Sequence, residues 1–422
     1  MPGDSSIPLP TSTKTPSSTS PVTTTDPPRV AVVGGGAVGL TAAVDLAARG
    51  AETTLYDRDG LGSGSSGRAA GVLYDAYAED VDAALAARAM ERFRGLDASL
   101  PGFSFTPCPY VIAVREGDED AESVRAMVER MRAHGRDVSV VDPEALGERF
   151  PLVTHDLAIA AVAEGAGWCD PGDYVAAMGE RARVEGVDVR TGVEVALGNE
   201  AADTTDPGAG PAPTLRIDGE PREFDAVVIA VGAHTESFFA NAGVSLPVKP
   251  YRVQALTSRR AYDGPMVYDA TAGAYFRPHP TGLLAGDGTE PVEADPDGYD
   301  PEADDWFRED VGEVLRERAD HDPDEERAWA GLCTATPDGD PLMGEVAPGV
   351  VVAAGWQGHG FMRAPAVGEH VAEGVLATLE RSGEDGDGAD ASPWIDAFDP
   401  QRFDGDESFE IREGMSVRSR SE

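Results

Sequence analysis

Cysteine and lysine are both rare in this chain of 422 residues. The three cysteines, Cys108, Cys169 and Cys333, are far apart and form no C-x-x-C pair. This spacing excludes a disulfide framework and predicts no metal site, and it fits a reducing compartment. We therefore expect a cytoplasmic protein. Lysine occurs only at Lys14 and Lys249, so nearly all positive charge is carried by arginine.

Positive charge of any kind is also scarce. The chain has 34 Lys and Arg against 76 Asp and Glu, which gives a formal net charge of -42. The acids are spread along the whole chain rather than gathered in one tail. Such a surface repels nucleic acid and anionic membranes, so we expect neither as a partner. It is typical of a protein adapted to concentrated salt, where screening weakens self-repulsion, and it predicts a halophilic source.

Long uninterrupted apolar runs are absent as well. The first 27 residues are rich in Ser, Thr and Pro, have no apolar core for a secretory signal, and predict a disordered tail. The apolar stretch that follows is broken by three consecutive glycines and then by Asp45 and Arg49. We therefore expect no membrane-spanning segment, although peripheral attachment to a membrane complex stays open.

The most informative feature is a glycine-rich turn between a strand and a helix. Apolar residues 30–33 predict a buried strand, residues 40–49 a helix, and residues 52–56 a second strand. The G-x-G-x-x-G spacing and the acid that follows it are formed by Gly34, Gly36, Gly39 and Asp57. These glycines allow a tight turn and close approach to a pyrophosphate, and the acid accepts hydrogen bonds from a ribose. The pattern predicts a dinucleotide site.

Strand and helix signals alternate along the rest of the chain. We expect strands at 110–114 and 350–354, a strand pair within 187–195, a buried strand at 226–231 and a β-rich region over 247–284. Helices are expected over 80–94 and 124–135, from the run 355–365 to near residue 379, in an acidic stretch reaching residue 327, and after Asp142-Pro143 and Asp170-Pro171. A polar loop over 199–213 predicts a hairpin tip, and residues 394–403 could pack on the body.

Several stretches together resemble the D-amino-acid oxidase superfamily of flavoproteins, especially its sarcosine oxidase and dimethylglycine dehydrogenase-like branch. They are the glycine turn with Asp57 and the segments 63–73, 167–171, 225–232, 275–282 and 329–360. The resemblance covers about residues 29–403 and implies FAD bound in an extended form. The implied fold is α/β, with a Rossmann-like FAD-binding domain and a discontinuous β-rich (α+β) substrate domain. The predicted FAD-binding parts are 28–85, 151–245 and 326–380, and the substrate parts are 86–150 and 246–325. Residues 1–27 form the tail and 381–422 an acidic C-terminal segment.

The resemblance also implies a set of cofactor contacts. The glycine turn, with Ala37 and Val38, approaches the pyrophosphate, and Asp57 with Arg58 lies at the adenosine. Val195 meets the adenine through its backbone, and Gly232 and Gly355 complete the set. A further run lies along the phosphates and the flavin: Ser65, Ser66, Gly67, Arg68, Ala69, Ala70 and Gly71. A helix N-terminus lies at the N1–O2 edge of the flavin, where it stabilises negative charge on the reduced form. This helix start is formed by Gly358, His359, Gly360, Phe361 and Met362.

This chain departs from its apparent relatives at positions that matter for chemistry. Gly331 stands where some members attach the flavin through cysteine, and Arg68 where others use histidine, so we expect non-covalent FAD. Cys333 stands where glycine oxidase-like members carry a carboxylate-binding arginine. Monomeric sarcosine oxidases carry a lysine at the position of Met362 and an oxygen-activating lysine near the position of Leu284. This chain has neither lysine. The electron acceptor can therefore be oxygen, as in an oxidase, or another carrier, as in a dehydrogenase.

The implied reaction is oxidation of the C–N bond of a small amino acid or N-methyl amino acid. The enzyme must orient a neutral amine and anchor its carboxylate. Arg277 is the first anchor candidate, before Arg252 and Lys249, although an ion pair with an acid would explain it equally well. Tyr275 and Tyr74 could line the substrate face, and His359 could meet flavin or substrate; each could also be structural. The alternatives are oxidation of a 2-hydroxy acid or polyol phosphate, and a non-catalytic FAD-binding assembly factor.

Overall fold

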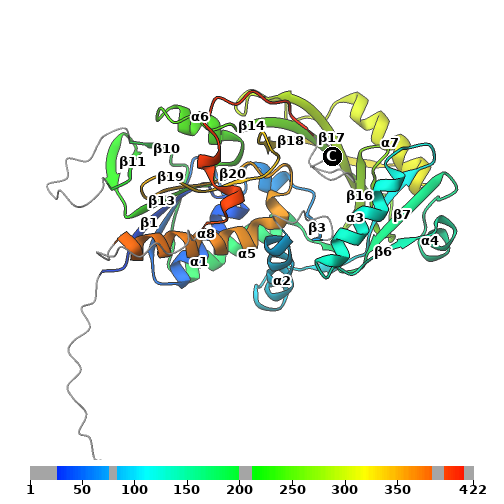
Figure 1. Cartoon of the computed structure of the whole chain (residues 1–422), viewed down its shortest axis with the longest axis horizontal. Helices are drawn as coiled ribbons and strands as arrows, with labels where there is room; N and C mark the ends of the chain where they lie inside the picture. The colour runs from blue at the N-terminus through cyan, green and yellow to red at the C-terminus, as the bar shows by residue number, and fades with distance from the viewer. Residues whose placement is uncertain (1–25, 76–82, 199–211, 383–393, 413–422) are drawn as a thin grey trace, which may run out of the picture.

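Two large β-sheets lie next to each other along the long axis of the molecule (Figure 1). The structure is a computed structural model, and it describes residues 26–75, 83–198, 212–382 and 394–412. The predicted disordered tail, the predicted hairpin tip and much of the acidic C-terminal segment therefore fall largely outside the described residues. The α/β class predicted from the sequence is confirmed.

The first sheet has six strands and contains the glycine-rich turn. Its order is β19 (Leu342–Ala347), β20 (Val350–Ala354), β13 (Ala226–Ile229), β1 (Arg29–Val33), β2 (Glu52–Asp57) and β9 (Asp188–Thr191). All neighbours are parallel except β19 and β20. The helix α1 (Ala37–Ala48) connects β1 to β2, as in a dinucleotide-binding βαβ unit. The strands expected near residues 30, 52, 226 and 350 are all present.

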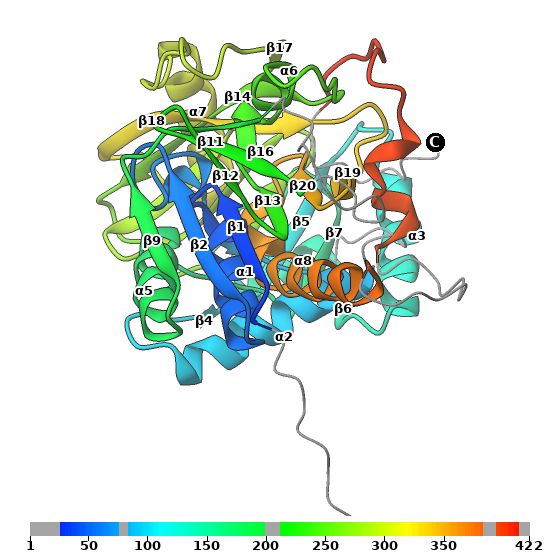
Figure 2. The same cartoon turned by 90° about the vertical axis from the view of Figure 1, so that its left-hand side faces the viewer.

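Both faces of this sheet are covered, which explains the unbroken apolar character of β1. Val30 and Val32 pack in the core that includes α1, α5 (Pro171–Val184) and α8 (Gly360–Ser382). Ala31 and Val33 face the opposite way, toward a small sheet of β10 (Val195–Leu197), β11 (Thr214–Ile217) and β12 (Glu220–Glu223). Figure 2 shows these helices and the small sheet on opposite sides of the strands. The strands expected as a pair within 187–195 do form, but β9 and β10 join different sheets, because the chain turns at Gly192 with φ +71°.

The second sheet has eight strands and supplies the other wall of the molecule's interior. Its order is β18 (Glu325–Ala335), β14 (Lys249–Ser258), β17 (Gly282–Glu293), β16 (Ala274–His279), β15 (Met266–Asp269), β5 (Tyr110–Arg115), β7 (Leu157–Ala163) and β6 (Val138–Val141). On β5, Val111 and Ala113 face a core shared with α7 (Asp305–Ala319), whereas Tyr110 and Ile112 face inward. β7 and β18 belong to this sheet, although the predicted domain boundaries place them in the FAD-binding parts 151–245 and 326–380. We therefore propose that both strands belong to the substrate domain.

The remaining elements are short or lie on the outside. They are α2 (Ala83–Ser99), α3 (Ala121–Ala133), α4 (Pro143–Arg149), α6 (Thr235–Ala240), a sheet of β3 (Val72–Leu73), β8 (Gly167–Trp168) and β4 (Thr106–Pro107), and the 3-10 turns η1 (Ser65–Arg68), η2 (Gly232–His234), η3 (Asp396–Phe398) and η4 (Pro400–Arg402). Asp142 and Asp170 accept hydrogen bonds from the first-turn amides of α4 and α5, which confirms both predicted helix starts. Phe398 is fully buried, so the 394–403 segment does pack on the body.

Candidate functional site

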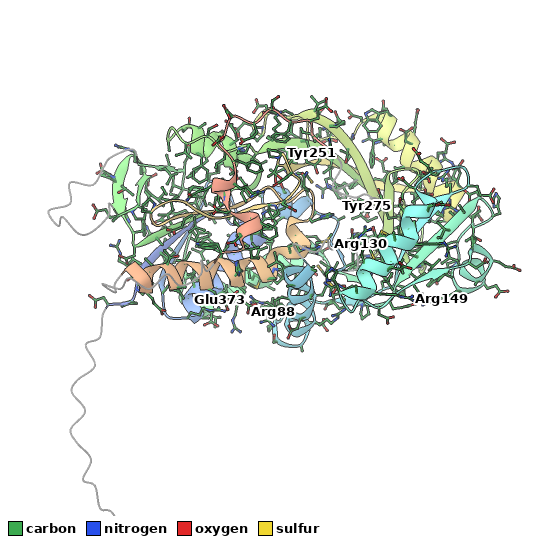
Figure 3. The ribbon with its side chains drawn as sticks, viewed as in Figure 1. Arg88, Arg130, Arg149, Tyr251, Tyr275 and Glu373 are labelled. Atoms are coloured by element: carbon green, nitrogen blue, oxygen red, sulfur yellow. The ribbon has the colours of Figure 1, made fainter. Side chains whose placement is uncertain are left out.

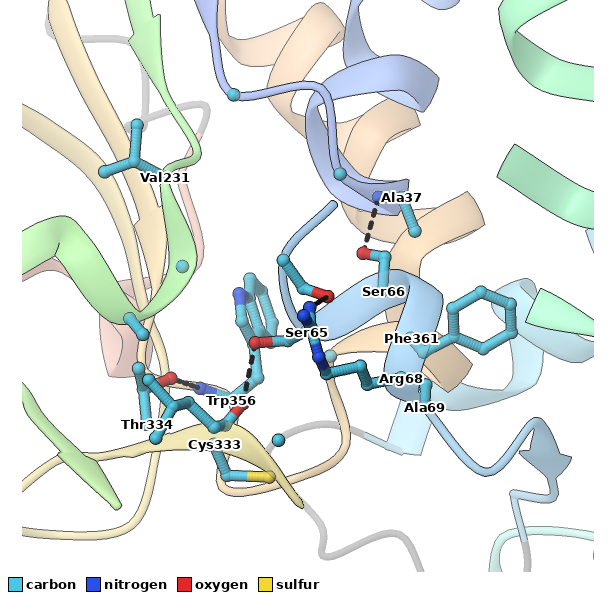
Figure 4. Close-up of a pocket in the computed structure, with 18 of the residues that line it drawn as sticks. Ala37, Ser65, Ser66, Arg68, Ala69, Val231, Cys333, Thr334, Trp356 and Phe361 are labelled. Atoms are coloured by element: carbon cyan, nitrogen blue, oxygen red, sulfur yellow. Dashed lines mark hydrogen bonds between the residues drawn. The ribbon is translucent and has the colours of Figure 1, made fainter. Parts of the chain in front are cut away.

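A cavity of about 690 Å³ lies between the two large sheets. One end is lined by the glycine-rich turn, the end of β2, β10 and η2. The other end is lined by side chains of β5, β14, β16 and β18 and by the turn that precedes α8. Figure 4 shows the middle of the cavity, where the segment that contains η1 approaches β18 and the first turn of α8.

The three motif glycines serve different purposes. Gly34 has φ +109°, and a Cβ there would overlap the carbonyl oxygen of Ala230. A Cβ on Gly39 would overlap the carbonyl oxygen of Gly34, so this position is fixed by close helix–strand packing. A Cβ on Gly36 would meet only Ser66 Oγ, at 3.0 Å, and would otherwise project toward the cavity. Gly34 and Gly39 therefore build the turn, and Gly36 keeps space open for a ligand.

The acid at the end of β2 fastens the same turn. Asp57 Oδ2 accepts a hydrogen bond from the Gly35 amide at 2.7 Å, and its Oδ1 accepts one from the Asp59 amide at 2.8 Å. The neighbouring Arg58 reaches across the cavity mouth to Asp297 at 2.7 Å. Asp57, Arg58, Val195 and Gly232, four of the predicted cofactor contacts, all line the cavity.

The segment over residues 63–71 is tied to β18 and to the start of α1, and Figure 4 shows some of these bonds. Ser65 Oγ donates to the Leu332 carbonyl at 2.6 Å, and Trp329 Nε1 donates to the Arg68 carbonyl at 3.1 Å. Ser66 Oγ accepts a hydrogen bond from the Ala37 amide at 2.9 Å. Its residues therefore hold a fixed path along the cavity wall, and all of 63–71 except Gly67 line it. A Cβ on Gly67 would overlap the Gly62 carbonyl oxygen, so this glycine shapes the turn.

The turn from β20 into α8 brings a helix N-terminus to the cavity. Gly355, Gln357 and Gly358 have φ values of +78°, +46° and +79°. Gly358 and the first residues of α8, through Met362, line the cavity. Gly355, which we predicted as a cofactor contact, does not line it, and a Cβ there would overlap the Thr336 side chain. The amides at the start of this long helix present partial positive charge to whatever fills this part of the cavity.

The far end of the cavity is rich in aromatic side chains. Tyr74, Tyr275, Tyr110 and Tyr251 all line it, and the rings of Tyr74 and Tyr110 are 4.7 Å apart. Figure 3 shows Tyr251 and Tyr275 toward the middle of the molecule, whereas Arg149 lies at its right-hand end. Tyr110 and Tyr251 are absent from our sequence-based site. The alternation of Tyr251, Val253 and Ala255, all of which line the cavity, was the signal that could have found the second.

Arg277 does not line the cavity, in contrast to our prediction of a substrate anchor. It is 1% exposed, and its Nε donates to the Ala70 carbonyl at 2.6 Å. Its Nη1 donates to the Pro278 carbonyl at 2.7 Å, and the guanidinium lies 4.8 Å from the centre of the Trp168 ring. Burial lowers the pKa of Arg277 to about 10. The alternative of an ion pair is not seen either, since backbone carbonyls and a ring surround this cation within the described residues. β16 does direct Arg277 to the same face as Tyr275, but residues 69–71 cover it.

The second and third anchor candidates are engaged elsewhere. Arg252 binds the carboxylates of Glu290 and Asp304, and its Nε donates to the Asp300 carbonyl at 3.0 Å. Lys249 Nζ donates to the Phe409 carbonyl at 2.8 Å. Neither lines the cavity. Among the described lining residues the arginines are Arg58 and Arg68, and Arg68 donates to the carbonyls of Ser63 and Gly64.

A search against known families and proteins adds to this geometry. The family described as FAD dependent oxidoreductase (DAO) matches residues 29–374. The chain belongs to this family. FAD is therefore the cofactor of this DAO-family oxidoreductase. The open cradle beside Gly36 and the helix N-terminus at α8 fit the pyrophosphate and the electron-rich edge of a flavin.

Individual relatives agree with the family. The chain is 28% identical over 372 residues to glycine oxidase of Geobacillus kaustophilus, a match that covers 82% of this chain and 92% of that protein. It is 29% identical over 308 residues to FAD-dependent oxidoreductase domain-containing protein 1 of Bos taurus, which covers 64% of this chain and 63% of the bovine protein. Among solved structures, L-proline dehydrogenase from P. horikoshii superposes with a TM-score of 0.75 at 26% identity, covering 89% of this chain and 98% of that one.

Two further properties bear on the site. Within the described residues, no three His, Cys, Asp or Glu side chains gather in a way that could hold a metal ion. No helix in the same part of the chain has the length and apolarity needed to cross a bilayer.

Proposed function

We propose that this chain oxidises the C–N bond of a small amine or amino acid. The single observation that carries the proposal is the continuity of the cavity, which runs from the dinucleotide-binding turn to a chamber walled by four tyrosines. Two relatives support the choice of bond, since their names describe oxidation of glycine and dehydrogenation of L-proline. One relative supports the polyol-phosphate alternative, since anaerobic glycerol-3-phosphate dehydrogenase subunit A1 of Haloferax volcanii is 29% identical over 300 residues. Against it, the arginines among the described lining residues are Arg58 and Arg68, and both are already engaged, with Asp297 and with backbone carbonyls.

Different residues would bind the adenosine diphosphate half and the flavin half of FAD. Gly36 with Ser66 would cradle the pyrophosphate, and Asp57 would hold the adenosine ribose. When bound, FAD supplies a hydride acceptor for the carbon that carries the amine. The first turn of α8, from Gly360, would stabilise negative charge at the flavin by up to about 2 kcal/mol where it is partly buried. We propose non-covalent attachment, because Gly331 and Arg68 offer no nucleophile at the two positions where relatives resembling this chain form a bond.

The tyrosine chamber would orient the substrate and exclude water. Tyr74 and Tyr110 are 2% and 1% exposed, and Tyr251 is 2% exposed, so their rings form a nearly dry wall. Exclusion of water from this chamber disfavours a charged amine and so favours the neutral form, from whose carbon a hydride can leave. We propose Tyr275 and His359 as further substrate-side contacts, since both line the cavity. The structure gives no support to Arg277 in the role of carboxylate anchor.

The electron acceptor is also part of the proposal. Leu284 is 3% exposed and packs with Ala255 and Trp329, so the region where sarcosine oxidases carry an oxygen-activating lysine is apolar here. We propose that electrons pass to an acceptor other than oxygen. We further propose that the enzyme works in concentrated salt, as its net charge of -42 suggests.

Anaerobic reduction of the bound flavin tests the function directly. The protein, purified in molar KCl and saturated with FAD, is mixed with glycine, sarcosine, proline, D-amino acids and 2-hydroxy acids, while the flavin absorbance is followed. We expect one amine class to bleach the flavin. Bleaching only by 2-hydroxy acids, or by none of these compounds, would overturn the proposal. Readmitting air then distinguishes an oxidase, which recovers its colour quickly, from a dehydrogenase, which does not.

A further inference from the structure

Gln357 is the feature of the cavity that neither the sequence prediction nor the fold explains. It lies between β20 and α8, lines the cavity and is 6% exposed. Its side-chain oxygen, Oε1, is buried and has no hydrogen-bond partner among the described residues. An unpaired amide oxygen of this kind carries a desolvation cost, because its hydrogen bonds to water are lost on folding and are not replaced. A ligand that donates a hydrogen bond would remove that cost.

The backbone of Gln357 is strained as well. Its φ of +46° lies in the left-handed region, which is unfavourable for a residue with a side chain. The conformation is held by a hydrogen bond from the Gln357 amide to the Thr334 carbonyl at 2.8 Å. Glycine would adopt this conformation without strain, as Gly355 and Gly358 do on either side. Backbone strain of this kind clusters at active sites and ligand-binding sites.

A second glutamine that lines the same cavity, Gln254, has a side-chain amide whose oxygen is paired within the protein. Gln254 is 2% exposed, and its Oε1 accepts a hydrogen bond from the Asp304 amide at 2.7 Å. The fold therefore pairs the buried amide oxygen of Gln254 internally. It leaves that of Gln357 unpaired among the described residues, in a residue that lines the cavity one turn before the N-terminus of α8.

We propose that Gln357 Oε1 accepts a hydrogen bond from N3–H of the flavin. This inference rests on the placement of the flavin in the proposed function. The pyrimidine edge of oxidised isoalloxazine carries several acceptors, at N1, O2 and O4, and a single donor at N3. The amides at the start of α8 can only donate, so they complement the acceptors. Gln357 supplies the one acceptor that the edge still needs, and its loss would weaken FAD binding about tenfold, the effect of one net hydrogen bond.

A chemical double-mutant cycle tests this assignment through binding alone. The dissociation constants of FAD and of N3-methyl-FAD, which lacks the donor, are measured by fluorescence titration for wild type and Gln357→Ala. We expect N3-methylation to weaken binding to wild type about tenfold or more, and to change binding to Gln357→Ala by less than about threefold. Equal effects of methylation in the two proteins would overturn the proposal.

Gln357→Gly separates the amide from backbone strain. This variant removes the side chain and relieves the positive φ, so its apoprotein should unfold at a temperature no lower than that of wild type. Its affinities for the two cofactors should match those of Gln357→Ala. Wild-type affinity for FAD in Gln357→Gly would show that the amide makes no cofactor contact. Because no turnover is measured, the cycle can succeed even if the proposed C–N oxidation fails.

Discussion

Replacing Gly36 by alanine should abolish tight FAD binding while leaving the apoprotein folded. Gly36 precedes α1 with φ -77° and ψ 179°, a conformation that alanine adopts without strain. Its new Cβ would approach only Ser66 Oγ, at 3.0 Å. That hydroxyl accepts the Ala37 amide hydrogen bond, so the apoprotein risks one bond worth about 1 kcal/mol.

The same methyl group has a much larger effect on the cofactor. It would project toward the space in which the pyrophosphate must approach the turn closely. Hydrogen bonds to a charged group contribute about 1.5–3 kcal/mol each. Losing one or two of them predicts a loss of about 3 kcal/mol, or a roughly hundredfold rise in the dissociation constant of FAD.

Gly39→Ala is the matched control, because the same methyl group is added to the same motif three residues later. A Cβ there would overlap the carbonyl oxygen of Gly34, and the helix would have to move away from the strand. Overpacking of this kind costs about 1–3 kcal/mol or more. We therefore expect Gly39→Ala to lower the unfolding temperature of the apoprotein, in contrast to Gly36→Ala.

The assay combines thermal unfolding of the apoproteins in molar KCl with fluorescence titration of FAD. The reasoning predicts near-normal unfolding with poor FAD binding for Gly36→Ala. Wild-type FAD affinity in Gly36→Ala would refute the cradle assigned to this glycine. Equal destabilisation of the two apoproteins would refute the division of the motif into packing and ligand positions.

The remaining predictions concern other parts of the molecule. Arg277→Met should weaken FAD binding about tenfold by leaving the Ala70 carbonyl unpaired; a raised KM for a carboxylated substrate with unchanged FAD affinity would instead favour an anchor. The hydrogen bond from Arg88 lowers the pKa of Glu369, so its stabilisation is present above the ordinary glutamate pKa and is lost as pH falls through the lowered one. Glu369→Gln should therefore reduce stability at neutral pH and flatten acid unfolding followed by circular dichroism, and an unchanged pH profile would contradict this. Lowering KCl from about 1 M to about 0.1 M lengthens the Debye length from about 3 to about 10 Å and should lower the unfolding temperature; no change would argue against salt adaptation.

The sequence by itself determined the dinucleotide-binding unit and the family. Spacing alone locates Gly34, Gly36, Gly39 and Asp57, because these positions depend on local geometry within one βαβ unit. The buried strands and the proline-initiated helices also follow from local signals, and the structure confirms them. Resemblance in several separate stretches then indicated FAD, which the family match supports.

Only the tertiary structure decided what surrounds each side chain. Strand alternation directs Arg277 to the same face as Tyr275, but it does not show that residues 69–71 cover that cation. Tyr110 and Gln357 reach the cavity from elements far from the glycine motif. Periodicity fixes the face on which a residue lies, whereas its contacts depend on segments that are distant in the sequence and brought together by packing. The cofactor could thus be predicted from the chain alone, and the substrate side could not.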